Sequence, residues 1–277
     1  MIFPPAYHII DSRPRDGNEE KRKTMIFDTH AHYDDKAFDA DRDQLLASMP
    51  EKGVGLILNP GCDAASSRAA LALAERFPFV YAAVGIHPEE LGEEPLGALD
   101  EIRKLAAHER CLAIGEIGLD YYWDVSRKEE QKQVFAAQLA LARELSLPVI
   151  VHDREAHGDC LEIVSRYPEV GGVFHCFSGS AETAEELLRR GWYLGFDGPV
   201  TYKNARKAIE VLAITPLDRI LVETDSPYMS PVPMRGKRND SSHLVYIIKR
   251  IAEVKGMAPE EVERITCENG KRLFQIS

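Results

Sequence analysis

Six side chains that commonly bind divalent metals each follow a short apolar run of the sequence. They are four histidines and two carboxylates: His30, His32, Glu116, His152, His175 and Asp225. Imidazole and carboxylate groups bind zinc, and sites rich in carboxylate and water also accept manganese or magnesium. Because one tetrahedral ion needs only about four ligands, these groups predict two divalent metal ions (Zn, Mn or Mg) that share a bridging carboxylate or water.

The apolar runs before these residues have the composition of buried parallel strands, which are nearly continuous in Val, Ile and Leu. Eight such runs occur, at residues 25–30, 54–61, 79–88, 111–118, 147–153, 171–177, 192–198 and 219–225. Helical patterns lie at 39–51, 64–76, 95–108, 128–146, 155–166, 180–190, 203–213, 240–255 and 259–273. Eight strands alternating with helices predict an α/β fold, a TIM (β/α)8 barrel, with a doubly wound sheet as the alternative.

The shared position of the six polar residues favours a metal site. In a TIM barrel, the C-terminal ends of the strands form one mouth, and the active site lies there. His30 and His32 are two residues apart at a strand end, so both imidazoles are expected on the same face. A single histidine after a strand is more often structural. All six residues follow the strand of a strand–helix unit, and this shared position indicates one common site.

Length and charge limit the fold and the partners. The chain has 277 residues, close to the roughly 250 of a TIM barrel. We therefore predict one domain over residues 25–277, preceded by a flexible leader, residues 1–24. The net charge of −11 argues against a broad basic face that wraps nucleic acid, although brief contact with a nucleic-acid end is compatible with it.

Cysteine content and hydropathy bear on the compartment. The five cysteines form no C-x-x-C pair and are odd in number, which argues against a disulfide framework. No apolar stretch approaches the roughly 18 residues that span a membrane. We expect a cytoplasmic monomer with no membrane association.

Other residues near the predicted mouth are candidates for binding substrate. His87 ends the third apolar run, and Arg154 follows His152. Arg235 and Arg238 lie in a basic, glycine-containing loop after the last strand, where barrel enzymes often bind phosphate. The alternatives are a structural histidine, a salt bridge at a helix start and a solvated charged loop.

Two further features have alternative interpretations. Tyr121, Tyr122 and Trp123 follow Glu116 and are expected either to line the pocket or to stack a base. Cys176 adjoins His175, which raises the question of a nucleophilic thiol. Neighbours on a strand point to opposite faces, so Cys176 is predicted to lie in the core.

Eight motifs in order resemble the TatD family of metal-dependent hydrolases, which belongs to the amidohydrolase-like TIM barrels. They are DTHAHYD (28–34), VGIHP (84–88), GEIGLDYY (115–122), PVIVHDREA (148–156), HCFSGS (175–180), GFDGPVTYKNA (195–205), ETDSPYMSP (223–231) and RGKRN (235–239). The resemblance extends from Met25 to about Leu273.

The resemblance implies a divalent-metal phosphoesterase, in many members a deoxyribonuclease of 3′-to-5′ exonuclease type. It assigns the role of metal ligand to His30, His32, Glu116, His152, His175 and Asp225. Glu116 would bridge the two ions. His30 and His32 would bind one ion, with Asp225 near it. His152 and His175 would complete the binding site of the other ion.

The predicted reaction is hydrolysis of a phosphodiester by a metal-activated water, with Asp225 as general base and Glu116 as the second catalytic carboxylate. The substrate would be a nucleic-acid end or a small phosphodiester, bound transiently. One alternative is a metal-dependent hydrolase of carboxylic esters or amides, such as an aminoacyl-tRNA ester or a lactone. The other is a non-catalytic metal-binding barrel.

Overall fold

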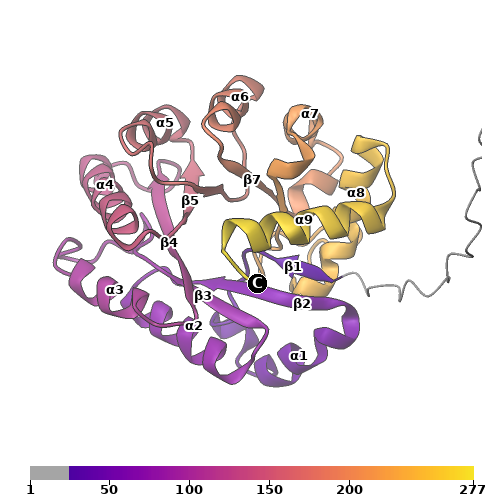
Figure 1. Cartoon of the computed structure of the whole chain (residues 1–277), viewed down its shortest axis with the longest axis horizontal. Helices are drawn as coiled ribbons and strands as arrows, with labels where there is room; N and C mark the ends of the chain where they lie inside the picture. The colour runs from indigo at the N-terminus through magenta and orange to yellow at the C-terminus, as the bar shows by residue number, and fades with distance from the viewer. Residues whose placement is uncertain (1–24) are drawn as a thin grey trace, which may run out of the picture.

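The computed structural model describes residues 25–277, and the predicted leader, residues 1–24, lies outside this range. Its eight parallel strands are hydrogen-bonded in sequence order. They are β1 (Ile26–Asp28), β2 (Val54–Pro60), β3 (Val80–Val84), β4 (Cys111–Asp120), β5 (Val149–Arg154), β6 (Gly172–Phe174), β7 (Tyr193–Phe196) and β8 (Ile220–Val222). The helices surround this sheet (Figure 1).

The ring of strands closes between its first and last members. The Thr29 N–H donates to the Val222 carbonyl at 3.2 Å, and the Asp225 N–H donates to the His30 carbonyl at 2.9 Å. This closure, with every strand pair parallel, confirms the TIM barrel. It excludes the doubly wound sheet, whose edge strands stay apart.

Nine α-helices occur in the described part of the chain. They are α1 (Arg42–Ser48), α2 (Ala64–Arg76), α3 (Leu99–Ala106), α4 (Lys128–Leu145), α5 (His157–Ser165), α6 (Ala181–Arg189), α7 (Arg206–Ile214), α8 (Leu244–Lys255) and α9 (Pro259–Leu273). Each was predicted within a few residues. The helix predicted at 39–51 is regular only over α1, and Pro50 begins a separate 3-10 turn after it. The helix predicted at 95–108 is regular only over α3.

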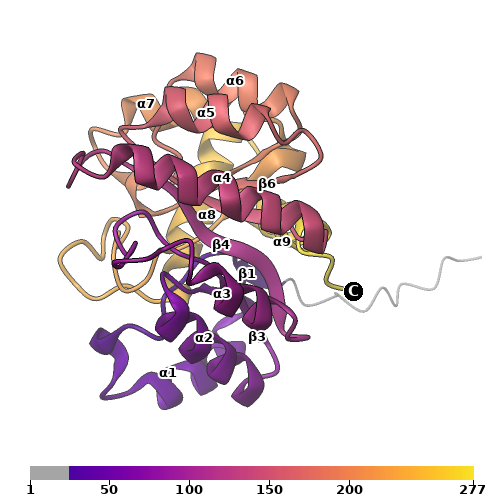
Figure 2. The same cartoon turned by 90° about the vertical axis from the view of Figure 1, so that its left-hand side faces the viewer.

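Two apolar cores hold the barrel. The inner core takes side chains from all eight strands, among them Phe27, Leu58, Ile150 and Leu221. The outer core lies between the strands and the helices, which cover the outside of the sheet (Figure 2). A strand that faces a core on both sides must be apolar along its whole length, which explains the continuous apolar runs.

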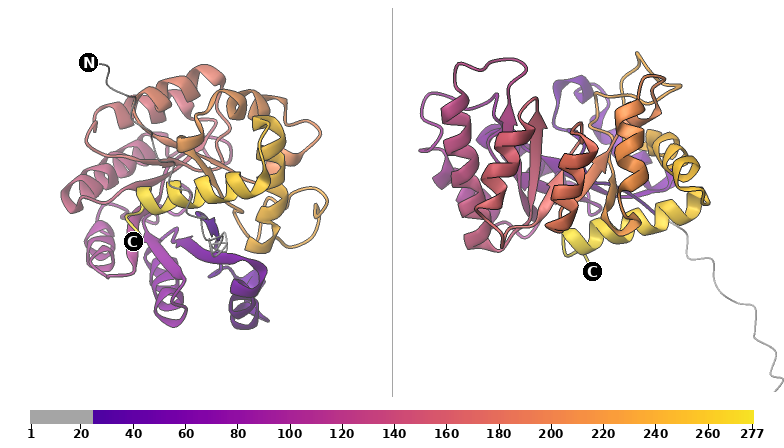
Figure 3. Two further views of the ribbon diagram at one scale, coloured as in Figure 1. Left: turned by 45° about the vertical axis from the view of Figure 1, so that its right-hand side comes forward. Right: turned by 90° about the horizontal axis from the view of Figure 1, so that it is seen from above.

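Helix α9 closes one end of the barrel. Phe274, at its C-terminal end, packs against Phe27 of β1 with ring centroids 6.0 Å apart. In Figure 3, α9 lies across the end opposite the loops that follow the strands. We call the end covered by α9 the closed end, and the C-terminal ends of the strands the mouth. Among residues 25–277, no helix has the length and apolarity needed to cross a membrane.

Candidate metal centre

Glu116 lies at the centre of the mouth, in contact with five imidazoles. It projects from β4 where the pairing with β5 shifts register between Ile114 and Ile117, an irregularity that re-aims side chains. Its Oε1 lies 2.7 Å from His175 Nε2, 2.9 Å from His152 Nδ1 and 3.6 Å from His87 Nε2. Its Oε2 lies 3.4 Å from His30 Nε2 and 3.6 Å from His32 Nε2. The two oxygens therefore face two different groups of histidines.

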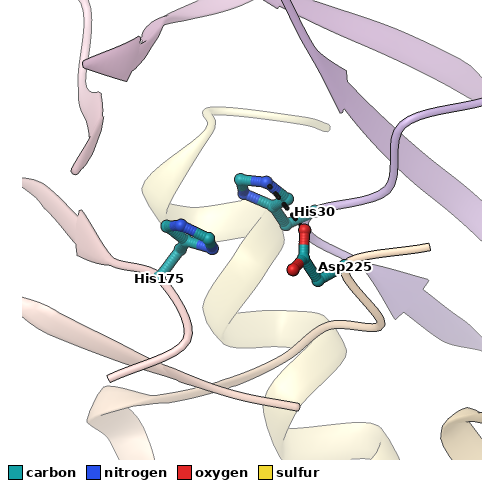
Figure 4. A group of neighbouring side chains, drawn as sticks. All are labelled: His30, His175 and Asp225. Carbon is teal, nitrogen blue, oxygen red and sulfur yellow. Dashed lines mark ion pairs between the residues drawn. The ribbon is translucent and has the colours of Figure 1, made fainter. Parts of the chain in front are cut away.

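The first group surrounds Glu116 Oε2. The Nε2 atoms of His30 and His32 are 3.0 Å apart. Asp225 Oδ1 lies 3.7 Å from the first ring and 3.5 Å from the second. Figure 4 shows His30, His175 and Asp225 directed toward one another from three separate segments of the mouth. Their nitrogen and oxygen atoms are close enough to coordinate a common ion.

The second group surrounds Glu116 Oε1. The rings of His152 and His175 approach each other to 3.3 Å between Nδ1 and Nε2. Asp120, at the end of β4, accepts a hydrogen bond from His152 Nε2 at 2.9 Å. A carboxylate on one ring nitrogen leaves the other free for a metal. His152 thus presents Nδ1 to the centre.

The donor chemistry of the cluster fits divalent metal ions. Ring nitrogens and carboxylate oxygens converge, and both are ligands that zinc and manganese accept. Such groups also need a cation electrostatically, because buried carboxylates are costly without one. Among residues 25–277, the Nδ1 atoms of His30 and His175 are buried without a hydrogen-bond partner. This set of donor atoms therefore suits divalent metal ions.

The histidines and carboxylates shift one another's pKa. Burial, followed by the charge of His175, lowers the pKa of His30 to about 4. Burial also disfavours charged His152, but hydrogen bonds to Asp120 and Glu116 outweigh it and raise its pKa to about 10. For Glu116, burial is outweighed by the surrounding imidazoles, which hold its pKa well below the usual range. The carboxylate is ionised throughout the physiological range.

His87 belongs to the cluster but has a different hydrogen-bond pattern. Its Nδ1 accepts the Glu89 backbone N–H at 3.2 Å, so its proton is assigned to Nε2, the atom facing Glu116. Burial, then the nearby charge of His152, lowers the pKa of His87 to about 3, which keeps the ring neutral. A neutral ring with a proton on Nε2 is a hydrogen-bond donor rather than a ligand.

A pocket of about 420 Å³ opens beside the cluster. His152, His175 and Asp225 form part of its wall. Its volume lies within the range of about 300–1,000 Å³ that is typical of small-molecule sites. The pocket therefore has room for a substrate group next to the candidate ligands.

Cys176 lines this pocket, so the prediction that it lies in the core was wrong. Strand β6 ends at Phe174, and Cys176 has a left-handed φ of 42°, so the alternation of faces along a strand no longer applies. Burial and the neighbouring Asp197 raise the pKa of its thiol well above the usual value. Such a thiol is not an activated nucleophile.

The three candidate arginines lie in different surroundings. Arg154 lines the pocket, and Arg235 stacks on Tyr202, a pocket residue, with 4.2 Å between its Cζ and the ring centroid. Arg238 instead forms an ion pair with Asp41 at 2.7 Å. Its interactions tie the loop before α8 to the turn that precedes α1.

Sequence reasoning missed three acidic residues of the mouth. Asp120 was missed because the predicted strand ended at residue 118. Asp197 follows the seventh strand and would have emerged from the same rule as the six ligands. Glu223 precedes Asp225 by two residues and is fully buried. Gly195 leaves space for it, because a Cβ there would lie 2.4 Å from the Glu223 carboxylate.

Burial makes two of these carboxyls weak acids. It raises the pKa of Asp197 to about 7, with a further contribution from the charge of Asp225. It also raises the pKa of Glu223 to about 8. The Cys176 backbone N–H donates to Glu223, which fixes the segment after His175.

Known proteins are similar to this chain in sequence and fold. The model of the TatD related DNase family matches residues 27–275. The metal-dependent hydrolase YabD of Bacillus subtilis is 45% identical, over 91% of this chain and 100% of that protein. The 3′-5′ ssDNA/RNA exonuclease TatD of Cronobacter sakazakii is 35% identical, over 90% of this chain and 97% of that protein.

A solved structure agrees with these sequence matches. The crystal structure of YjjV, a TatD homologue from Escherichia coli K12, is 32% identical and superposes with a TM-score of 0.87, over 92% of this chain and 100% of that one. The family model, the sequence matches and the fold agree, and the chain belongs to the TatD family of metal-dependent hydrolases.

Proposed function

We propose that the protein is a divalent-metal phosphodiesterase that removes nucleotides from the 3′ end of single-stranded nucleic acid. The observation that carries the proposal is the position of Glu116, whose two carboxylate oxygens face two groups of imidazoles. The name of the Cronobacter sakazakii relative, a 3′-5′ ssDNA/RNA exonuclease, supports the choice of substrate. The protein would act as a cytoplasmic monomer on transiently bound ends.

Two divalent ions would share Glu116 as a bridging ligand. His30 and His32, with Asp225 near them, would hold one ion, and His152 with His175 would hold the other. Bound there, the ions would polarise the scissile phosphate and lower the pKa of water. Zinc and manganese suit the mixture of imidazole and carboxylate, and magnesium suits it less well.

Asp225 would accept the proton of the attacking water. Burial disfavours its charge, but a hydrogen bond with His32 and the nearby imidazoles lower its pKa, so the carboxylate is ionised at neutral pH. Its side chain is 15% exposed, at the wall of the pocket. A carboxylate in this state is a competent general base.

The substrate phosphate would be oriented by neutral and cationic donors around the pocket. The Nε2–H of His87 would donate to a phosphate oxygen without adding charge. Arg154 and Arg235 form no ion pair among residues 25–277, so their guanidinium groups are available to an anion. Arg238, which is held by Asp41, would position the loop rather than contact the phosphate.

The test combines metal content with hydrolysis of two substrates. Metal is measured in the purified protein, and cleavage of 5′-labelled single-stranded DNA and of bis-p-nitrophenyl phosphate is followed before and after chelation. Two ions per chain, with both activities lost to chelator and restored by zinc or manganese, is the expected result. Light scattering on the same sample tests the monomer.

Two other outcomes would overturn the proposal. Bound metal with hydrolysis of p-nitrophenyl acetate or a lactone, but of no phosphodiester, would favour the carboxylic ester alternative. Bound metal with no hydrolysis of any of these substrates would favour a non-catalytic barrel.

A further inference from the structure

Two large aromatic rings lie exposed beside the mouth. Tyr122 is 55% exposed and Trp123 is 65% exposed. They follow β4 directly, and their rings meet edge to face, with centroids 4.8 Å apart and planes at 87°. Exposed aromatic rings are costly to hydrate, and those near an active site commonly contact a ligand.

Arg154 covers both rings. Its Cζ lies 3.9 Å from the Tyr122 centroid and 5.4 Å from the Trp123 centroid. Within residues 25–277 its guanidinium has no carboxylate within ion-pair distance. We call Tyr122, Trp123 and Arg154 the aromatic platform. It offers flat π surfaces and free N–H donors together.

One carboxylate connects the aromatic platform to the metal centre. Asp120 Oδ1 accepts the backbone N–H groups of Tyr122 and Trp123, at 2.8 and 3.3 Å, while its Oδ2 holds His152. Arg154 lies two residues beyond His152 on β5, on the same face of the strand. That spacing is roughly 7 Å along the strand, which is on the scale of one nucleotide.

We propose that the aromatic platform stacks a base of the single strand, one nucleotide from the phosphate held at the metal centre. This inference rests on the proposed function, and it adds the surface that holds the strand. Base stacking on aromatic rings beside an arginine tolerates any sequence, because every base has a π face. The free guanidinium would also contact the backbone phosphate, which an acidic protein must bind locally.

The first test compares variants on a strand and on a small ester. Trp123→Ala should raise KM for a labelled oligo(dT) by about 5- to 150-fold, the range for loss of one stacked base. The ratio of kcat/KM on oligo(dT) to that on bis-p-nitrophenyl phosphate should fall by a similar factor. Arg154→Ala should also raise KM for oligo(dT), but it should lower activity on bis-p-nitrophenyl phosphate too, because Arg154 lines the pocket that would hold the phosphate.

Arg143→Ala is the matched control. Arg143 also stacks on a tyrosine, with its Cζ 5.6 Å from the Tyr167 centroid, but it lies in the last turn of α4, toward the closed end. Loss of that pair should leave both substrates unaffected. An equal loss of both activities in Trp123→Ala would overturn the inference, because the residue would then support the metal centre rather than the strand. Unchanged kinetics in Trp123→Ala would also overturn it.

A binding measurement separates this inference from the proposed function. The chain has two tryptophans, and the other, Trp192, is only 3% exposed. Oligo(dT) added to the chelated, inactive protein should quench the emission of Trp123, and the quenching should vanish in Trp123→Ala. Quenching in a protein without phosphodiesterase activity would retain the aromatic platform and refute the nuclease. No quenching in an active nuclease would refute the aromatic platform alone.

Discussion

The two ends of the barrel differ in how far their polar side chains find hydrogen-bond partners. At the closed end, Arg272 Nε donates to the Tyr193 hydroxyl at 3.0 Å. Asn269 Nδ2 donates to the carbonyls of Leu217 and Ile220, at 2.7 and 2.9 Å. Each of these donors has an acceptor, although Arg110 Nε, just before β4, is buried without one. At the mouth, five imidazoles surround Glu116, and the Nδ1 atoms of His30 and His175 have no hydrogen-bond partner among residues 25–277.

This difference separates stability from function. Polar groups that satisfy one another hold an element in place, as Asn269 holds α9 against the strand β8. Buried polar groups that lack hydrogen-bond partners lower the stability of the fold unless a ligand binds them. Among residues 25–277, most of the buried side-chain atoms without a hydrogen-bond partner lie at the mouth, on His30, Asp153, His175 and Asp197. The predictions that follow alter one end at a time and measure metal binding, activity and stability.

The largest effect is expected for Glu116→Gln. The amide keeps the size of the side chain but removes the charge that faces both groups of histidines, so both ions should bind weakly. We expect kcat/KM on bis-p-nitrophenyl phosphate to fall by about 10³-fold or more. Metal content, measured by mass spectrometry, should fall in parallel. Retention of both ions would remove Glu116 from its bridging position.

Asp225→Asn should keep the fold and lose turnover. The amide cannot accept a proton from water, and loss of a general base costs about 10²- to 10⁴-fold in kcat. KM should change much less. An unchanged melting temperature would show that the fold is intact. Near-normal turnover in this variant would assign proton transfer to another group.

Metal affinity should rise with pH. In the metal-free protein, hydrogen bonds to Asp120 and Glu116 outweigh burial and raise the pKa of His152 to about 10, so its ring is protonated at neutral pH. An ion must displace that proton, and the apparent Kd should fall by up to about tenfold per pH unit from pH 7 to 9. Competition with a chelator at several pH values measures this. A flat profile would mean that His152 is no ligand.

The same proton has a consequence for the metal-free fold. A histidine whose pKa is raised on folding stabilises the protein fully below the unfolded value, about 6.5. That contribution is lost as the pH rises through about 10. The melting temperature of the chelated protein should therefore decrease between these values, and bound metal should reverse the trend.

Asp120→Asn should have a smaller effect than loss of a ligand. Asp120 fixes His152 through Nε2 but contacts no predicted ion itself. Second-layer carboxylates of this kind are worth about 10- to 100-fold in metal affinity or activity. Asp218→Asn, near the closed end, is the control because Asp218 forms an exposed ion pair with Arg219. Equal effects of the two variants would contradict the assigned role of Asp120.

The sequence predicted the strands well, and it named six residues that the structure brings together at the mouth, because both depend on local patterns. Continuous apolar runs mark strands buried on both faces, and a polar residue at each strand end marks the mouth. Contacts between distant segments carry no such pattern. Nothing near Arg238 indicates that Asp41, almost two hundred positions away, neutralises it. The direction of Cys176 depended on where β6 ends, which sequence patterns locate poorly.

The closed end provides the smallest expected effect on activity. Phe274 is 2% exposed and packs on Phe27 beneath the inner core. Phe274→Ala should lower the free energy of unfolding by about 3–5 kcal/mol, from lost burial and the cavity left behind. The ligands are at the other end of the strands, so kcat on bis-p-nitrophenyl phosphate at low temperature should match that of the unaltered protein. Chemical denaturation and the phosphodiesterase assay measure the two quantities separately. A drop in kcat well below the melting transition would show that packing at the closed end controls the geometry of the mouth.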